Sequence, residues 1–257
     1  MLYKQRRRLY SQNNLVNPKL IAKLIRKSSL GKNDKVIEIG PGRGIITQEL
    51  LKVAGRVTAI ELDRKLYFHL KEKYKNAKNL ELIRGDFLNF RMPPYSYKVF
   101  SNIPFNITSG VLRKLTDDDN FLEAYIVIQK EAARRFIGMP FDNKNSMVSV
   151  LLKPWFEIDI FWNFRRHDFI PNPHVEVAMI RIVRRKHPLI NLADKNMYRD
   201  YIVYNFSRLK IAELRFEKVL KLFNRFVEKS NYREKKRVSV EAQKFLAHQK
   251  SFHKRRN

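Results

Sequence analysis

Short apolar runs alternate with stretches of helical spacing from residue 17 to about residue 130. Runs rich in Val, Ile and aromatic residues predict buried strands at 35–40, 56–63, 79–86, 97–101 and 123–129. Apolar residues three and four positions apart predict helices at 18–26, 44–54, 64–75, 108–116 and 130–138. Strands that alternate with helices indicate βαβ units, and therefore an α/β fold whose parallel sheet is covered on both faces.

The rhythm changes after residue 146. Two strand-like runs, at 146–164 and 175–186, follow one another with no helical stretch between them, which predicts a hairpin that completes the sheet. From about residue 188 onward the spacing of apolar residues is helical. We therefore expect one domain over residues 1–186 and a small helical domain over residues 187–257.

The balance of charges indicates a polyanionic partner. The chain has 53 lysine and arginine residues against 25 aspartate and glutamate residues, a net charge of +28 and a pI near 10.3, which is typical of nucleic-acid-binding domains. Apolar residues make up 44% of the sequence, enough for a core. The basic clusters are scattered along the chain, and no apolar run approaches the ~20 residues of a spanning helix, so we expect no membrane partner.

The chain contains no cysteine, which excludes disulfides, thiolate nucleophiles and zinc–thiolate sites. The six histidines show no metal-ligand spacing, so we expect no metal site. The basic N-terminus is not followed by an apolar segment and is therefore not a secretory signal. We expect a cytoplasmic protein that acts as a monomer.

Three alternate glycines, Gly40, Gly42 and Gly44, lie where the first predicted strand gives way to a helix. Glycine at such a turn permits positive φ and lets a ligand approach the main chain closely. The dinucleotide-binding pattern G-x-G-x-x-G fails, because its sixth position is Ile45. No Gly-Lys-Ser/Thr follows, so the loop is not a P-loop either.

Two acidic residues end the next two predicted strands. Glu61 follows Gly40 by 61 − 40 = 21 residues, a position from which a carboxylate can accept hydrogen bonds from ribose hydroxyls. Asp86 ends the following strand and could accept a hydrogen bond from an adenine amino group. The alternative is a turn that merely requires glycines, beside two carboxylates that cap helices. Because ligands bind at the C-terminal ends of strands in such sheets, we favour a binding site.

Residues 37–44 resemble the cofactor loop of class I S-adenosylmethionine-dependent methyltransferases. With SQNNL at 11–15 and NIPFN at 102–106, the chain is similar to the ribosomal RNA adenine N6-dimethyltransferases, which include the small-subunit enzyme and the Erm enzymes that modify large-subunit RNA. The resemblance implies a Rossmann-like class I methyltransferase sheet, a small C-terminal helical domain and S-adenosyl-L-methionine as the cofactor. It also implies cofactor contacts from Gly40, Gly42, Glu61, Asp86 and Asn102.

The segment that begins at Asn102 resembles the family's catalytic motif, Asn-(Ile/Leu/Pro)-Pro-(Tyr/Phe). An exocyclic adenine amine is a weak nucleophile inside a base stack, so an enzyme must flip the base out and orient its nitrogen. The Asn102 carboxamide oxygen and the Ile103 carbonyl can accept its hydrogens. Pro104 removes a backbone donor, and Phe105 offers a ring on which the adenine can stack. The alternative is a β-turn followed by a helix N-cap at Thr108.

Two further segments extend the resemblance. By the family pattern, Asn13 and the Leu15 backbone contact the cofactor, and Asn14 stands where an aromatic residue is usual. FIPNPHVEVAMIRI, at 169–182, resembles the family's Phe-x-Pro-x-Pro-x-Val segment, a loop beside the target base, and Val177 stands where a serine is common.

The RNA substrate is indicated by the form of the motif. Asn-Ile-Pro and the short helical tail are more similar to the Erm group than to the small-subunit enzymes, which more often show Asn-Leu-Pro-Tyr and a longer C-terminal domain. The resemblance then implies N6-methylation or dimethylation of adenine in 23S rRNA, with resistance to macrolide, lincosamide and streptogramin B antibiotics. Dimethylation of 16S rRNA, a non-catalytic nucleic-acid-binding relative and, more distantly, DNA adenine methylation are the alternatives.

Six basic clusters can neutralise RNA phosphates and release counterions. Such contacts position an RNA without reading its sequence. The clusters lie at 4–8, 134–135, 165–166, 184–186, 233–237 and 254–256.

Overall fold

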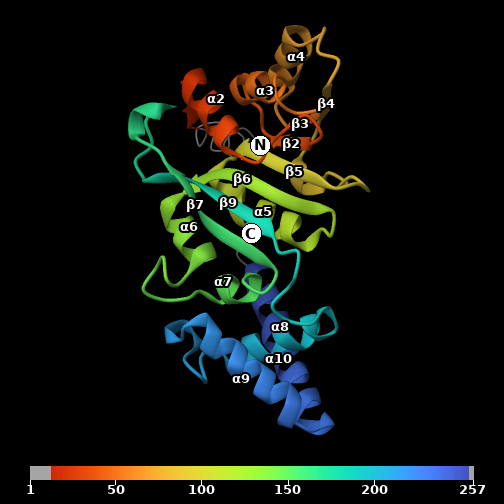
Figure 1. Ribbon diagram of the computed structural model, residues 1–257, viewed down its shortest axis with the longest axis vertical. Helices are drawn as coiled ribbons and strands as arrows, with labels where there is room; N and C mark the ends of the chain where they lie inside the picture. Colours follow the sequence, from red (N-terminus) through yellow and green to blue (C-terminus); the bar gives the residue numbers. More distant parts are fainter. Residues whose placement is uncertain (1–12, 255–257) are drawn as a thin grey trace. The chain divides into compact units, whose positions relative to one another are not determined.

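The computed structural model describes residues 13–254, and the side chains of residues 13–248 (Figure 1). The basic clusters expected at 4–8 and 254–256 lie outside the described side chains, as do the first two residues of the SQNNL segment.

Contacts divide the chain into two compact units. Of the described residues, the first unit contains 13–133 together with Ile158–Arg184, and the second contains Arg134–Glu157 and 185–254. The division after Arg184 lies close to the domain boundary predicted at residue 186.

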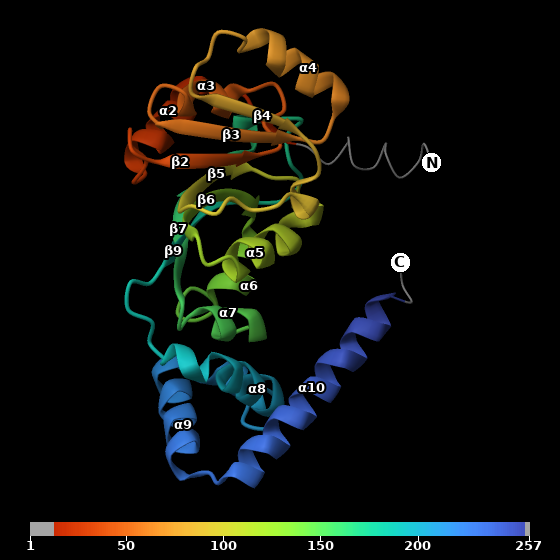
Figure 2. The ribbon, with the colours of Figure 1, turned by 90° about the vertical axis from the view of Figure 1, so that its right-hand side faces the viewer.

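A seven-stranded sheet with the order β4-β3-β2-β5-β6-β9-β7 forms the framework of the fold (Figures 1 and 2). Its strands are β2 (Lys35–Ile39), β3 (Arg56–Glu61), β4 (Leu80–Arg84), β5 (Tyr97–Asn102), β6 (Phe121–Gln129), β7 (Phe156–Asn163) and β9 (Val177–Arg184). The first five pair in parallel, and β9 pairs antiparallel with β6. β7 lies beside β9 at the edge, so the predicted α/β sheet and its closing strand pair are confirmed.

The helices predicted between these strands are also confirmed, with ends shifted by a few residues. They are α2 (Pro18–Lys27), α3 (Ile45–Leu50), α4 (Arg64–Lys73), α5 (Thr108–Asp117) and α6 (Lys130–Ile137). α2 begins as its sequence predicts, because the Asn17 side chain accepts a hydrogen bond from the Leu20 amide at 3.1 Å and Pro18 occupies the first turn. No helix among the described residues is long and apolar enough to cross a membrane.

The strand predicted over 146–164 is wrong in its first part, where α7 (Met147–Leu152) is a helix. Ser146 caps this helix, and its hydroxyl accepts a hydrogen bond from the Ser149 amide at 3.0 Å. A short apolar run fits a buried helix as well as a buried strand, so the capping serine was the signal that distinguished them.

The core of the first unit joins α2, α3 and the sheet to β8 (Phe169–Ile170), a two-residue strand outside the sheet. Its fully buried members include Ile21, Leu24, Phe100, Tyr125, Phe169 and Met179. Each such side chain contributes about 1.5–3 kcal/mol through burial. Since Phe169 is among them, β8 is anchored in the core although it pairs over only two residues.

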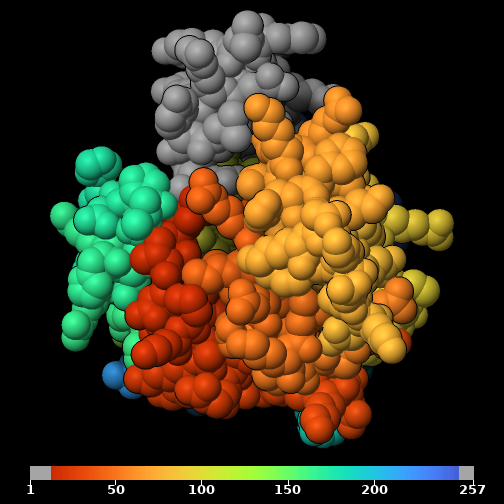
Figure 3. Space-filling view, turned by 90° about the horizontal axis from the view of Figure 1, so that it is seen from above, coloured from red at the N-terminus to blue at the C-terminus, as the bar shows by residue number. Residues whose placement is uncertain are grey.

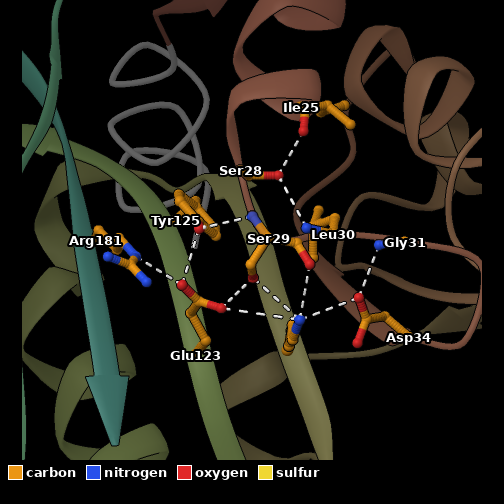
Figure 4. A network of polar contacts seen from close by, with 10 residues as sticks. Ile25, Ser28, Ser29, Leu30, Gly31, Asp34, Glu123, Tyr125 and Arg181 are labelled. Atoms are coloured by element: carbon orange, nitrogen blue, oxygen red, sulfur yellow. Dashed lines mark hydrogen bonds and ion pairs between the residues drawn. The ribbon is translucent and has the colours of Figure 1, made fainter.

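A buried carboxylate, Glu123, fastens the end of α2 to the N-terminal end of the sheet (Figure 4). It accepts hydrogen bonds from the Ser29 hydroxyl, the Tyr125 hydroxyl at 2.8 Å and Arg181 Nε at 2.7 Å. Lys98 Nζ donates to the Ser29 carbonyl at 3.0 Å. Burial alone would raise the pKa of Glu123, but the hydrogen bonds from Ser29, Arg181 and Tyr125 outweigh burial and lower it.

The second unit is helical, as predicted for the residues from about 188 onward. Its longer helices are α8 (Lys195–Asn205), α9 (Phe216–Lys229) and α10 (Tyr232–Lys254). Tyr198 of α8 donates to the Val150 carbonyl of α7 at 2.8 Å, and its ring lies 5.0 Å from that of Phe223 on α9. The Asn145 side-chain amide donates to the Leu214 carbonyl at 2.8 Å. These contacts explain why the α7 region packs with the C-terminal helices.

Candidate active site

The candidate site begins where the order of the sheet reverses, between β2 and β5. From this point the chain builds β3 and β4 on one side and β6 on the other, and such switch points are where parallel sheets bind ligands. The last ladder pair joins Ile37 to Val99. Beyond it, the Ser101 hydroxyl donates to the Ile39 carbonyl at 2.6 Å and accepts from the Ile39 amide at 3.2 Å. The buried serine therefore holds together the strand ends from which both site loops start.

A cavity of about 490 Å³ lies at this edge, within the range of about 300–1,000 Å³ that is usual for small-molecule sites. Four segments form its wall: residues 13–16, the end of β2 with the turn and the first residues of α3 that follow it, residues 102–105 after β5, and residues 170–171. Of the predicted site residues, those that line the cavity are Asn13, Leu15, Gly40, Asn102, Ile103, Pro104 and Phe105. Those that lie outside its lining are Gly42, Glu61 and Asp86.

The glycine turn has the backbone geometry that its sequence predicts. Gly40 and Gly44 adopt left-handed conformations, with φ of 66° and 79°, which favour glycine. A Cβ on Gly40 would have no atom within 4 Å, so the main chain there faces open space. At Gly44 a Cβ would lie 2.7 Å from Leu70 and 2.8 Å from Tyr74, whose hydroxyl donates to the Gly44 carbonyl at 2.6 Å. The turn is thus closed on the α4 side and open toward the cavity.

Glu61 supports this turn from behind. Its side chain is buried, and it accepts hydrogen bonds from the Gly42 amide at 3.0 Å and the Asp63 amide at 2.8 Å. Burial raises the pKa of Glu61 despite these two donors. Its predicted contact with a ribose stays a prediction.

Asp86 caps a short 3-10 helix, η1 (Phe87–Asn89), and accepts from the Leu88 amide at 2.9 Å. Lys114 of α5 holds the same loop by donating to the Leu88 carbonyl at 2.9 Å. The capping role that was the alternative for Asp86 is therefore present. Its predicted contact with adenine stays a prediction.

Glu38, near the C-terminal end of β2, lines the cavity and was missed by the sequence predictions. It is 1% exposed, and burial raises its pKa to about 8, although the Thr47 hydroxyl donates to it at 2.6 Å. A nearby Glu61 charge adds to the shift. The signal in the sequence was an acidic residue inside an otherwise apolar strand, which is costly unless the carboxyl is used. The exposed Arg43 of the glycine turn also lines the cavity and was likewise missed.

Asn102 is oriented by the segment that precedes α2. Its side-chain Nδ2 donates to the Asn13 carbonyl at 2.8 Å. No described residue donates to its Oδ1, so this acceptor remains for a ligand in the cavity that Asn102 lines. Phe105 is the first residue of η2 (Phe105–Ile107). Its side chain packs against the core, and the residue lines the same cavity.

The two flanking segments that resemble family motifs pair with each other. β1 (Asn14–Leu15) is antiparallel to β8, with Asn14 opposite Ile170 and Leu15 opposite Phe169. In Figure 3 the green segment that includes β8 lies beside the red N-terminal segment. The sequence predicted that each segment lies near the site, but not that they form one wall.

The cavity fits S-adenosylmethionine, the cofactor that the resemblance implies. The open space beyond Gly40 would admit a ligand against the main chain. The Glu38 carboxyl and the Arg43 guanidinium are the groups that an α-amino acid end requires, an oxygen acceptor for its ammonium and a cation for its carboxylate.

The ribosomal RNA adenine dimethylase family model matches residues 3–244. The chain is 33% identical to an rRNA adenine N-6-methyltransferase of Bacteroides fragilis, over 77% of this chain and 73% of the relative. It is also 33% identical to the ribosomal RNA small subunit methyltransferase A of Borreliella burgdorferi, over 74% and 68%.

Solved structures of other enzymes are also similar to this chain. The 23S rRNA methyltransferase ErmE superposes with a TM-score of 0.76 at 29% identity, covering 83% of this chain and 99% of that one. A dimethyladenosine transferase from Plasmodium falciparum superposes with a TM-score of 0.69 at 23% identity, covering 84% and 98%, and supports the fold. The chain belongs to the ribosomal RNA adenine dimethylase family.

Proposed function

We propose that this chain methylates N6 of a specific adenosine in 23S rRNA and thereby confers resistance to macrolide, lincosamide and streptogramin B antibiotics. The family gives the reaction class: the chain is an S-adenosylmethionine-dependent rRNA adenine N6-methyltransferase. The choice of 23S rRNA is supported by the similarity to ErmE along nearly its whole length. The Asn-Ile-Pro form of the motif supports the same choice.

The observation that carries the proposal is the free acceptor of Asn102 beside the Phe105 ring. Because the Asn13 carbonyl holds the amide nitrogen of Asn102, its oxygen can accept one N6–H of an extruded adenine. The Ile103 carbonyl is the second acceptor, since Pro104 has no N–H that would compete. Stacking on Phe105 contributes about 1–3 kcal/mol and offsets the few kcal/mol needed to flip a base out.

The cofactor supplies a methyl group on a positively charged sulfur. Glu38 and Arg43 would hold its amino acid end, and the Gly40 and Asn13 main chain would border it. By resemblance, Gly42, Glu61 and Asp86 complete the cofactor set. Acceleration then depends on alignment, because Asn102 and Phe105 hold the amine in line for transfer.

Transfer of radiolabelled methyl groups tests the proposal. The protein is incubated with labelled S-adenosylmethionine and in vitro transcribed 23S rRNA, and in parallel with immature small ribosomal subunits. We expect label in 23S rRNA, mapped by mass spectrometry to methylated adenosine, and a raised inhibitory concentration of erythromycin in susceptible cells that express the chain. Label in the small subunit alone, with unchanged erythromycin sensitivity, would overturn it.

Dimethylation of 16S rRNA is the second candidate, favoured by the small-subunit methyltransferase from Borreliella burgdorferi at the same 33% identity. The small-subunit arm of the same assay detects it. If the chain were instead a non-catalytic nucleic-acid-binding relative, isothermal titration should detect no binding of S-adenosylmethionine.

The wider proposal assigns residues 1–186 to catalysis and cofactor binding and residues 187–257 to RNA binding. Exposed cations at the start of α10, Arg233, Lys236 and Arg237, support the second assignment. Because its substrate is ribosomal RNA, we place the enzyme in the cytoplasm, and we keep the expectation that it acts as a monomer.

A further inference from the structure

Helix α9 of the second unit has two chemically distinct faces. One face is apolar and supports the fold: Val219 and Phe223 are buried, and the Phe223 ring lies 5.5 Å from that of Tyr201 on α8. Since the helix has 14 residues, it is about 21 Å long. Its length and its anchored inner face make it a rigid support for whatever its outer face carries (Figure 2).

The outer face carries a row of four exposed cations, the α9 stripe. Its members are Lys218, Lys221, Arg225 and Lys229. Steps of three, four and four residues place all four within roughly 80° of the helix circumference, and the row extends about 16 Å. A straight row of fixed positive charges results, on the side of the helix away from Phe223.

The four cations have no partners within the described part of the chain. None of them forms an ion pair or a side-chain hydrogen bond with a described residue, whereas surface lysines elsewhere do, as Lys52 does with Glu49 at 2.6 Å. The helix's own carboxylates, Glu217 and Glu228, lie at one edge of the stripe and pair with none of its members. The charge of the stripe is therefore available to an external anion.

The stripe does not appear as a cluster in the sequence. Each of the six clusters recognised there contains adjacent cations, whereas these four are separated from one another by two or three other residues. Only the helical period brings them together.

We propose that the α9 stripe docks on the phosphate backbone of a double-stranded segment of the substrate rRNA. This inference rests on the proposed function and adds the surface and the form of RNA that it takes. A straight, rigid row of cations matches a duplex, whose backbone presents phosphates in fixed rows.

Two other occupants fit the stripe less well. Single-stranded RNA is bound mainly by aromatic stacking platforms, and the exposed aromatic residues among the described side chains, Phe68, Phe141, Tyr232 and Phe245, all lie outside α9. A membrane surface requires a flanking apolar face that can insert, and here that face is buried against α8.

The test removes the stripe and compares it with an equal loss of charge elsewhere. The stripe variant is K218Q/K221Q/R225Q/K229Q. The control is R64Q/K65Q/K71Q/K78Q, which removes four exposed cations on and near α4. Each variant lowers the net charge from +28 to 28 − 4 = +24. Affinity for an RNA duplex of about two helical turns and for single-stranded poly(U) is measured at several salt concentrations.

We expect the stripe variant to bind the duplex about tenfold or more weakly and its salt slope to fall by up to about 4, one unit per lost phosphate contact. The control should keep the slope of the unsubstituted protein. Equal losses in both variants, or a loss confined to poly(U), would overturn the inference. Unchanged affinity for S-adenosylmethionine shows that the first unit of each variant is folded, and an unchanged helical circular-dichroism signal shows that the second unit is folded.

The two proposals fail in different ways. If the unsubstituted protein does not methylate 23S rRNA, the proposed function fails whatever the stripe does. If it methylates 23S rRNA but the stripe variant binds the duplex as well as the control does, only the α9 inference fails.

Discussion

Two buried carboxyl groups, at opposite ends of the same sheet, are treated in opposite ways. Glu123, near the N-terminal end of β6, receives hydrogen bonds from three side chains, and its pKa is lowered. Glu38, near the C-terminal end of β2, receives one side-chain hydrogen bond, from Thr47, and burial raises its pKa to about 8. Both are at most 5% exposed. Burial raises the pKa of both groups; at Glu123 three donors and the positive charge of Arg181 outweigh it, whereas at Glu38 the single Thr47 hydroxyl does not.

The comparison extends from these two residues to the ends of the sheet on which they lie. The N-terminal end satisfies its charges internally, which stabilises the fold. The cavity end leaves two polar groups without a full set of protein partners, the Glu38 carboxyl and the Asn102 oxygen. Groups left in this state cost stability and are typical of binding sites.

Asn102→Ala should have the largest effect. Loss of the free acceptor should lower the rate of methyl transfer by about 10²–10³-fold, as for other groups that act only in the transition state. The affinity for S-adenosylmethionine should stay within about threefold, measured by isothermal titration. Asn106→Ala, an exposed neighbour outside the cavity lining, is the control. A large loss of cofactor affinity with an unchanged rate would contradict the assigned role.

Glu123→Gln should destabilise the fold by about 2–3 kcal/mol at neutral pH, because three donors lose a charged acceptor. The folded pKa of Glu123 is lowered, so its contribution is present above the unfolded pKa of about 4.5 and is lost as pH falls through the folded value. Urea unfolding at several pH values measures this.

The control for Glu123 is Glu176→Gln, whose side chain is 69% exposed and pairs with Lys130 at 3.4 Å. It should cost under about 1 kcal/mol. A penalty for Glu123→Gln that persists at pH 3 would show that packing, not charge, is what Glu123 contributes.

Glu38→Gln should act with the opposite sign. Between the unfolded pKa of 4.5 and the folded value of about 8, the folded protein binds one proton more than the unfolded chain, so its stability falls as pH rises. The variant lacks this term. Relative to the original protein, it should gain up to about 1.4 kcal/mol per pH unit across that window. If the free energies of unfolding of Glu38→Gln and of the original protein differ by the same amount at every pH, the contrast between Glu38 and Glu123 is wrong.

Glu61→Ala should have the smallest of these effects. It removes the acceptor that holds the Gly42 amide and loosens the turn that borders the cavity. We expect about tenfold weaker binding of S-adenosylmethionine, about 1.4 kcal/mol, with a nearly unchanged rate at saturating cofactor. Glu72→Ala, on the exposed side of α4, should change neither quantity. An unchanged cofactor affinity for Glu61→Ala would show that Glu61 does not contribute to cofactor binding.

Much of the architecture follows from the sequence, because local signals coincide with the global fold. The strands of the first unit are short runs rich in aliphatic and aromatic residues, and α2 carries its own cap and proline at Asn17 and Pro18. The alternate glycines predict a turn that the φ angles of Gly40 and Gly44 confirm. Within the described residues, the 147–152 segment was assigned to the wrong element, because a short apolar run has no period of its own.

The features that could not be predicted depend on residues far apart in the chain. The pairing of Leu15 with Phe169 involves two strands of two residues each, which leave no periodic signal. The protonation of the Glu38 carboxyl depends on how completely neighbouring residues exclude water from it, and this cannot be predicted from the sequence of β2 alone. The α9 stripe exists only in the folded helix, whose period places the four separated cations on one side.

The neutral carboxyl of Glu38 has a calorimetric consequence. If this carboxyl ionises when a cationic ligand binds, each binding event at pH 7 releases one proton, which the buffer takes up. The apparent enthalpy of association would then depend on the ionisation heat of that buffer, and titrations in phosphate and in Tris would disagree by the difference between the two heats.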